Sequence, residues 1–112
     1  MAQIETPLED RLARLEAIIA ERRMADPASS YVASLAQKGR KKIAQKVGEE
    51  AVETVIAAMA DDREEVITES ADLLFHLACL LADMDIRFAD ILAELDRREG
   101  VSGLVEKAAR PK

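Results

Sequence analysis

Two stretches decide the fold of this chain: residues 41–60, KKIAQKVGEEAVETVIAAMA, and residues 63–81, REEVITESADLLFHLACLL. Both are rich in Val, Ile, Leu and Ala, and their charged side chains keep to part of the helical wheel, which is typical of α-helices that pack against other helices. Only Asp61 and Asp62 close the first helix and open the second. So short a connection predicts two antiparallel neighbouring helices.

A further helix is expected ahead of this pair, beginning at Thr6. Thr6 has the side chain of an N-cap, Pro7 suits the first helical position, and Glu9 at the third position would complete a capping box. The apolar side chains that follow recur at helical spacing. The helix is therefore expected to run to about Met24, before Pro27 ends it.

A second, shorter helix is expected from Ser29 or Ser30, either of which can serve as its N-cap. It should run through Gln37, with Tyr31 and Leu35 as its buried pair.

A last helix is expected over about residues 86–98, with Gly100 as its C-terminal cap. The tail from Val101 is expected to be loosely structured, because it contains Ser102-Gly103 and several charges. The chain of 112 residues is long enough for one domain. These features predict an all-α fold, a single domain over residues 1–112 with four to five helices in an antiparallel bundle.

The helix expected over about residues 63–81 also bears on assembly. Its second half is apolar on nearly every side, and such a helix is normally buried on several sides. A chain of 112 residues has little material with which to surround it. We therefore expect helices of partner chains to complete the bundle, in a homodimer or a larger homo-oligomer.

Composition excludes several classes of function. The net charge of −6 argues against a general nucleic-acid binder, which would carry a basic excess. No apolar run approaches the length of about 18 residues that spans a membrane, and the first residues do not have the pattern of a secretory signal. Cys79, the one cysteine, is expected to be a buried, inert thiol in a reducing compartment. A cytoplasmic location and no membrane partner follow as expectations.

Four carboxylates are the main candidates for a functional site. Glu50 and Glu53 lie three residues apart in one helix, and Glu69 and Asp72 have the same spacing in the next. Each pair therefore projects from one side of its helix. If the two sides face each other, the four carboxylates need a compensating cation, and Mg²⁺ prefers such oxygen ligands. The alternative is that they are solvated polar faces that happen to align.

Two lysines and a histidine share these faces. Lys42 and Lys46 lie on the face of Glu50 and could bind phosphate near a metal, although Lys46 could equally form a simple i, i+4 pair with Glu50. His76, one turn beyond Asp72, could be a general base, a base-stacking contact, a ligand, or only a hydrogen-bonded residue beside the core.

Other chemistries fit the sequence poorly. A di-iron carboxylate bundle uses Glu-x-x-His pairs on two helices, whereas this chain has one histidine and no glutamate three residues before it. A cysteine nucleophile is disfavoured because Cys79 is expected to be buried.

The sequence also resembles a known family. The motifs that carry the resemblance are Lys46-Val47-Gly48-Glu49-Glu50-Ala51-Val52-Glu53, Glu69-Ser70-Ala71-Asp72-Leu73-Leu74-Phe75-His76, and Arg98-Glu99-Gly100-Val101-Ser102-Gly103-Leu104. They are similar to those of the phosphoribosyl-ATP pyrophosphohydrolases, the histidine-biosynthesis branch of the all-α, MazG-like nucleotide pyrophosphatases. The likeness extends over about residues 8–110.

The resemblance implies hydrolysis of phosphoribosyl-ATP to phosphoribosyl-AMP and pyrophosphate, with Mg²⁺ as cofactor, in a homodimer or larger assembly. It implies metal ligation by Glu50, Glu53, Glu69 and Asp72, and catalytic roles for Glu49, Glu50 and Glu53. Glu49 would complete a second metal site or orient water, and Lys42 and Lys46 would contact phosphate. The alternatives are a house-cleaning nucleoside triphosphate pyrophosphatase and a non-enzymatic helical assembly subunit.

Overall fold

Six α-helices make up the part of the chain that the computed structural model describes, residues 6–100 and 103–110. They are α1 (Leu8–Arg22), α2 (Tyr31–Lys38), α3 (Arg40–Met59), α4 (Arg63–Asp83), α5 (Phe88–Arg98) and α6 (Gly103–Ala109). The predicted all-α class is confirmed. The count exceeds the expected four to five because part of the tail forms α6; positions 101, 102, 111 and 112 of that tail lie outside the described residues.

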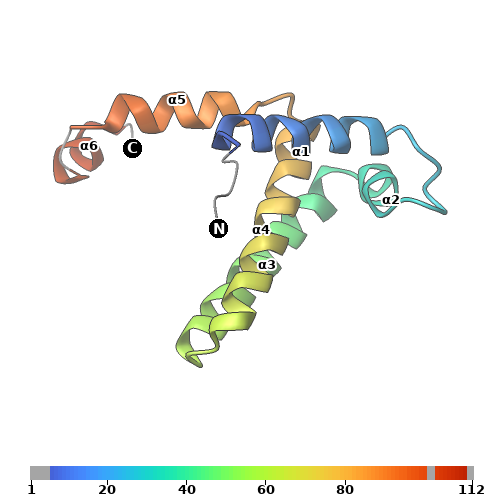
Figure 1. Cartoon of the computed structure of the whole chain (residues 1–112), viewed down its shortest axis with the longest axis horizontal. Helices are drawn as coiled ribbons and strands as arrows, with labels where there is room; N and C mark the ends of the chain where they lie inside the picture. Colours follow the sequence, from blue (N-terminus) through green and yellow to red (C-terminus); the bar gives the residue numbers. More distant parts are fainter. Residues whose placement is uncertain (1–5, 101–102, 111–112) are drawn as a thin grey trace.

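Helices α3 and α4 form an antiparallel hairpin that projects from the other helices (Figure 1). Asp61 turns the chain with a left-handed backbone (φ 58°), a conformation that aspartate tolerates better than most residues. Asp62 then caps α4 by accepting a hydrogen bond from the Glu65 N–H at 3.1 Å. The two aspartates therefore make the short antiparallel connection that the sequence predicts.

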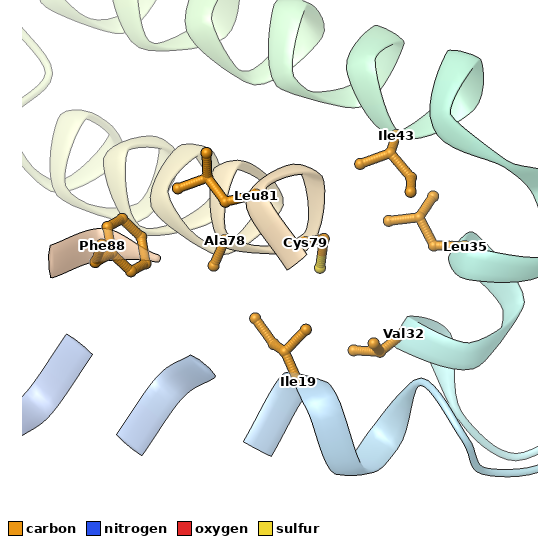
Figure 2. Packing of buried hydrophobic residues seen from close by; sticks show 8 residues of the cluster. All are labelled: Ile19, Val32, Leu35, Ile43, Ala78, Cys79, Leu81 and Phe88. Carbon is orange, nitrogen blue, oxygen red and sulfur yellow. The ribbon is translucent and has the colours of Figure 1, made fainter. Parts of the chain in front are cut away.

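The hydrophobic core lies at one end of this hairpin, where α1, α2 and the start of α5 meet the last turns of α4 (Figure 2). Its buried members are Ile19, Val32, Leu35, Ile43, Ala78, Cys79, Leu81 and Phe88. Full burial of one large apolar side chain stabilises a fold by about 1.5–3 kcal/mol. The chain's own hydrophobic stabilisation is therefore concentrated at this end.

Asp83, the last residue of α4, ties the hairpin to α1. Its carboxylate accepts a hydrogen bond from Arg40 Nε at 2.6 Å and lies 3.6 Å from a terminal nitrogen of Arg23. Arg23 also donates to the carbonyl oxygen of Ala82 at 2.8 Å. Arg23, the C-cap of α1, and Arg40, the first residue of α3, thus donate to backbone carbonyls at the carboxyl end of α4, which have no partner within the helix.

The beginning of α1 differs from the prediction. Pro7 has an extended backbone (ψ 144°) and is itself the N-cap, without a capping side chain. Its carbonyl oxygen accepts from the N–H groups of Asp10 and Arg11 at 3.0 and 3.2 Å. The predicted capping box of Thr6 and Glu9 was wrong, because the helix begins one residue later and Thr6 lies outside it.

The beginning of α2 agrees with the prediction in one respect and not in another. Ser30 is the N-cap, and its hydroxyl oxygen accepts from the Ala33 N–H at 3.1 Å. Leu35 is buried as predicted, but Tyr31 is 52% exposed. Tyr31 was wrongly assigned to the core, because its hydroxyl reaches His76 on α4 and its ring stays near the surface.

The far half of the hairpin has no cover from the other described residues of its own chain. Val52, Val55, Ile56 and Met59 of α3 and Ile67 of α4 are all exposed, Met59 by 82%. The radius of gyration is 16.4 Å, whereas a compact domain of this length has about 13 Å. None of the helices in the described residues is long and apolar enough to cross a membrane.

Candidate metal centre

Three carboxylates converge where α3 faces α4. One carboxylate oxygen from each of Glu50, Glu69 and Asp72 lies within 4.8 Å of the other two. Glu50 comes from α3 and is 7% exposed, whereas Glu69 is half-buried and Asp72 is exposed. The antiparallel hairpin therefore joins residues from two helices into one cluster, closed on one side and open to solvent on the other.

Glu50 is the most constrained member of this cluster. Its Oε1 lies 3.8 Å from the ammonium nitrogen of Lys46, but its buried Oε2 has no hydrogen-bond partner. An unsatisfied buried polar atom costs about 1–3 kcal/mol, and more when it is charged. A cation held between Glu50, Glu69 and Asp72 would remove that cost, and an all-oxygen donor set suits a hard ion such as Mg²⁺.

Glu53 lies outside that trio, exposed on α3, but acts on the same site through Glu69. The pKa of Glu69 is raised to about 7, first by hydrogen bonding with Glu50, then by partial burial and by the Glu53 carboxylate. A proton on Glu69 would provide a donor for the Glu50 carboxylate, which has none when every carboxyl in the cluster is ionised. The single ammonium of Lys46 does not balance the charge of these carboxylates, and a cation would serve in place of that proton.

Lys46 and Glu49 form the rim of the cluster on α3. The Lys46 ammonium lies 3.4 Å from Glu49 Oε1, and Gln45 donates to Glu49 Oε2 at 2.8 Å. These two contacts, that of Gln45 first, lower the pKa of Glu49, and the charge of Lys42 adds to them. Lys46 thus makes the pair with Glu50 that the spacing allows, while phosphate binding by Lys42 and Lys46 stays a prediction.

His76 connects the cluster to α2. It is 6% exposed, and its Nδ1 lies 2.7 Å from the carbonyl oxygen of Asp72. Because a carbonyl only accepts, Nδ1 carries the hydrogen. In the neutral ring Nε2 then accepts from the Tyr31 hydroxyl, at 2.8 Å. The i, i+4 spacing in the sequence indicated the contact of His76 with Asp72, but no sequence pattern indicated its contact with Tyr31.

Cys79 takes no part in the cluster. It is a free thiol, buried as predicted, and burial raises its pKa to about 11. A thiol that stays protonated at neutral pH is a poor nucleophile.

Two comparisons with known proteins agree on one family. The model of the family described as phosphoribosyl-ATP pyrophosphohydrolase matches residues 12–99, a range that contains Glu49, Glu50, Glu53, Glu69 and Asp72.

Curated relatives match at high identity over most of their length. A protein of Rhizorhabdus wittichii named phosphoribosyl-ATP pyrophosphatase is 70% identical over 101 residues, 90% of this chain and 95% of the relative. Proteins of the same name from Novosphingobium aromaticivorans and Zymomonas mobilis are 66% and 62% identical. These alignments cover 88% and 93% of this chain, and 92% and 97% of the relatives.

Proposed function

The chain belongs to the phosphoribosyl-ATP pyrophosphohydrolase family, and we propose that it hydrolyses phosphoribosyl-ATP to phosphoribosyl-AMP and pyrophosphate in L-histidine biosynthesis in the cytoplasm. The observation that carries this proposal is the buried Glu50 carboxylate, whose Oε2 lacks a partner at the point where the carboxylates of α4 converge. The names of the relatives supply the substrate, which the geometry alone does not identify.

We propose that Glu50, Glu53, Glu69 and Asp72 hold Mg²⁺. When bound, the ion supplies Lewis-acid polarisation of phosphoryl oxygens and neutralises their charge. The donor set fits, because four carboxylates offer only oxygen ligands and Glu50 is fixed by burial. Hydrogen bonding with Glu50, partial burial and the charge of Glu53 raise the pKa of Glu69 to about 7, and a bound cation would favour its ionised form at neutral pH.

The side chains of the rim have separate tasks in this mechanism. Water attacks phosphorus at the α–β anhydride, the anhydride bond breaks, and pyrophosphate leaves. Glu49, kept ionised by its hydrogen bonds from Gln45 and Lys46, orients the water and accepts its proton. Lys42 and Lys46 stabilise the negative charge that develops on the departing pyrophosphate.

We further propose that the working unit is a homodimer or a larger homo-oligomer. The chain has 8493 Å² of accessible surface, whereas a folded monomer of 12.3 kDa has about 6,100 Å². The excess is larger than the roughly 800 Å² that one partner contributes to a standard interface. The exposed apolar side chains of the hairpin, Val52, Val55, Ile56, Met59 and Ile67, are the surface that a second copy would cover.

Pyrophosphate release from phosphoribosyl-ATP, measured with and without Mg²⁺, tests the reaction. The proposal expects release that depends on Mg²⁺ and exceeds the turnover of dUTP and other free triphosphates. Preferential turnover of free triphosphates would favour a house-cleaning pyrophosphatase instead. Full activity in the Glu50→Gln, Glu53→Gln double variant would exclude the carboxylate mechanism.

A further inference from the structure

Three of the four aromatic side chains in the chain, counting histidine, gather at one place. The sequence contains one tyrosine, two phenylalanines, one histidine and no tryptophan. Of these, Tyr31, Phe75 and His76 contact one another, and Phe88 lies in the core. In a chain with 3% aromatic residues, this cluster is a feature to be explained.

The ring of Tyr31 is fixed although it is half exposed. Its hydroxyl bonds to His76 Nε2 at 2.8 Å, and its ring stacks on Phe75 with centroids 6.3 Å apart and planes 27° apart. His76 meets both rings edge-on, with centroid distances of 5.7 and 5.3 Å. A hydrogen bond and a stacking contact therefore orient the ring, and 52% of Tyr31 stays exposed.

This ring lies beside the candidate metal centre. His76, which holds the Tyr31 hydroxyl, also bonds to the carbonyl oxygen of Asp72. Burial raises the pKa of Tyr31, the charge of Lys46 opposes this, and the carboxylates of Glu50 and Asp72 add to it. The hydroxyl is thus within electrostatic reach of side chains from both helices of the site.

We propose that Tyr31 is a stacking platform for the purine base of the substrate, with His76 and Phe75 holding the ring in position. The inference rests on the proposed function, since that substrate carries an adenine base next to the phosphates. The hydroxyl of Tyr31 is already bonded to His76, so the ring face is the part left free for a ligand. Any nucleobase can stack on an aromatic ring, because every base has a π-face.

The surroundings of Tyr31 favour a nucleotide over a second copy of the chain as its occupant. Lys46, Glu50 and Asp72 place charge around the ring, whereas interface cores are depleted of charge. The large exposed apolar side chains of α3 begin only at Val52, six residues and about 9 Å along the helix axis from Lys46. On α3, the apolar surface proposed to meet a second copy therefore begins beyond Lys46.

Intrinsic fluorescence can test the platform directly. Tyr31 is the only tyrosine and there is no tryptophan, so the tyrosine emission of the full chain reports on this ring alone. With Mg²⁺ present, ATP should quench the emission in a saturable way, whereas tripolyphosphate, which has the phosphates without a base, should not. Free tyrosine amide titrated in parallel corrects for light absorbed by ATP.

Two variants of Tyr31 separate stacking from phosphate binding. Tyr31→Leu should raise the Kd for ATP about tenfold, whereas Tyr31→Phe, which keeps the ring, should change it by no more than about threefold. Calorimetry should find the Kd for tripolyphosphate unchanged in both. Equal losses for ATP and tripolyphosphate would overturn the proposal, as would an emission that responds to protein dilution but not to ATP.

A third variant tests the positioning role of His76. In His76→Ala the tyrosine anisotropy without nucleotide should fall, because the ring loses its hydrogen bond, and the Kd for ATP should rise; unchanged anisotropy would remove His76 from the proposal. Failure of the parent reaction is distinguishable from these results. If pyrophosphate is released but Tyr31 shows no base-dependent effect, only the stacking proposal is rejected. If ATP quenches the emission in a base-dependent way but no pyrophosphate is released, the proposed reaction is rejected.

Discussion

The two ends of the α3–α4 hairpin are built from similar residues but have opposite surroundings. At one end, α1, α2 and α5 cover the hairpin, and Ile43, Ala78 and Leu81 are buried (Figure 2). At the other end, Ile56 and Met59 face solvent. Apolar periodicity therefore identifies the helix surfaces that need to be buried. The length of the chain decides which of these surfaces its own helices can bury.

The candidate metal centre lies between these two ends. Glu50 comes from the middle of α3 and is nearly as buried as the core residues, while Glu53, one turn further from the core, is exposed. A carboxylate cluster at this boundary has low-dielectric surroundings on one side and access for a substrate on the other. Stability from the core end and assembly at the far end should therefore be separable from activity at the centre.

The largest effect on stability is expected at the core end. Ile19 is fully buried, so Ile19→Ala removes buried methyl groups and leaves a cavity, which costs about 2–5 kcal/mol. Urea denaturation should report this loss of unfolding free energy. Ile56→Ala, the matched change at the exposed far end, should cost less than about 1 kcal/mol in the isolated chain. Equal losses at both positions, measured at concentrations that keep the chain monomeric, would contradict the contrast between the two ends.

The hairpin and the approach of Glu50 to Glu69 and Asp72 could be predicted from sequence, whereas Glu53 was expected in the same cluster and lies outside it. Helical periodicity is local, and the Asp61-Asp62 turn leaves the two long helices no arrangement other than antiparallel. The N-cap at Ser30 is a similarly local signal, because a hydroxyl and a backbone N–H three residues on decide it.

The partner of His76, the start of α1 and the unpartnered oxygen of Glu50 could not be predicted. They depend on contacts between residues distant in sequence, or on backbone conformations of nearly equal energy. Tyr31 and His76 are 45 residues apart, and no local pattern pairs them. The start of α1 lies one residue later than predicted, because Pro7 is compatible with either the cap or the first helical position. The unpartnered Oε2 of Glu50 also depends on packing between helices.

A large effect on activity is expected at the centre. Glu50→Gln should lower pyrophosphate release by at least about 100-fold, since even residues that only support metal ligands contribute 10–100-fold. The same variant should leave the melting temperature of the metal-free protein unchanged or raised, because a buried charge with an unsatisfied oxygen is removed. Glu64→Gln, an exposed change near the start of α4, is the control. A fall in both activity and stability would make Glu50 a structural residue.

A smaller effect, on assembly alone, is expected at the far end. Ile56→Glu and Met59→Glu place charges on the surface proposed to meet a second copy, so sedimentation should detect more monomer at a given concentration. The monomeric chain should keep its helical circular dichroism, because neither side chain is buried within it. Tyr31→Glu, which lies outside that surface, should not shift the monomer fraction. An unchanged distribution in the double variant would move the interface elsewhere on the chain.

The smallest effect is expected in how the stability of the metal-free protein depends on pH. This effect tests whether the carboxylates between the two ends of the hairpin interact. Glu69 has a pKa of about 7 in the folded chain against an ordinary 4.5, so the folded state binds its proton more tightly than the unfolded state. Between these two values the folded state holds more protons, and stability therefore falls as the pH rises. The melting temperature without Mg²⁺ should decrease from pH 5 to pH 8 more steeply in the natural chain than in Glu69→Gln.

Added Mg²⁺ should reduce this difference between the two proteins, because the cation opposes the repulsion that Glu50 and Glu53 exert on an ionised Glu69. Glu64→Gln should keep the slope of the natural chain, since Glu64 lies outside the cluster. Identical slopes for the natural chain and Glu69→Gln would mean that the carboxylates do not interact across the hairpin. The centre would then be an ordinary solvated surface like the polar faces of α5, and its Glu50 carboxylate would need another partner.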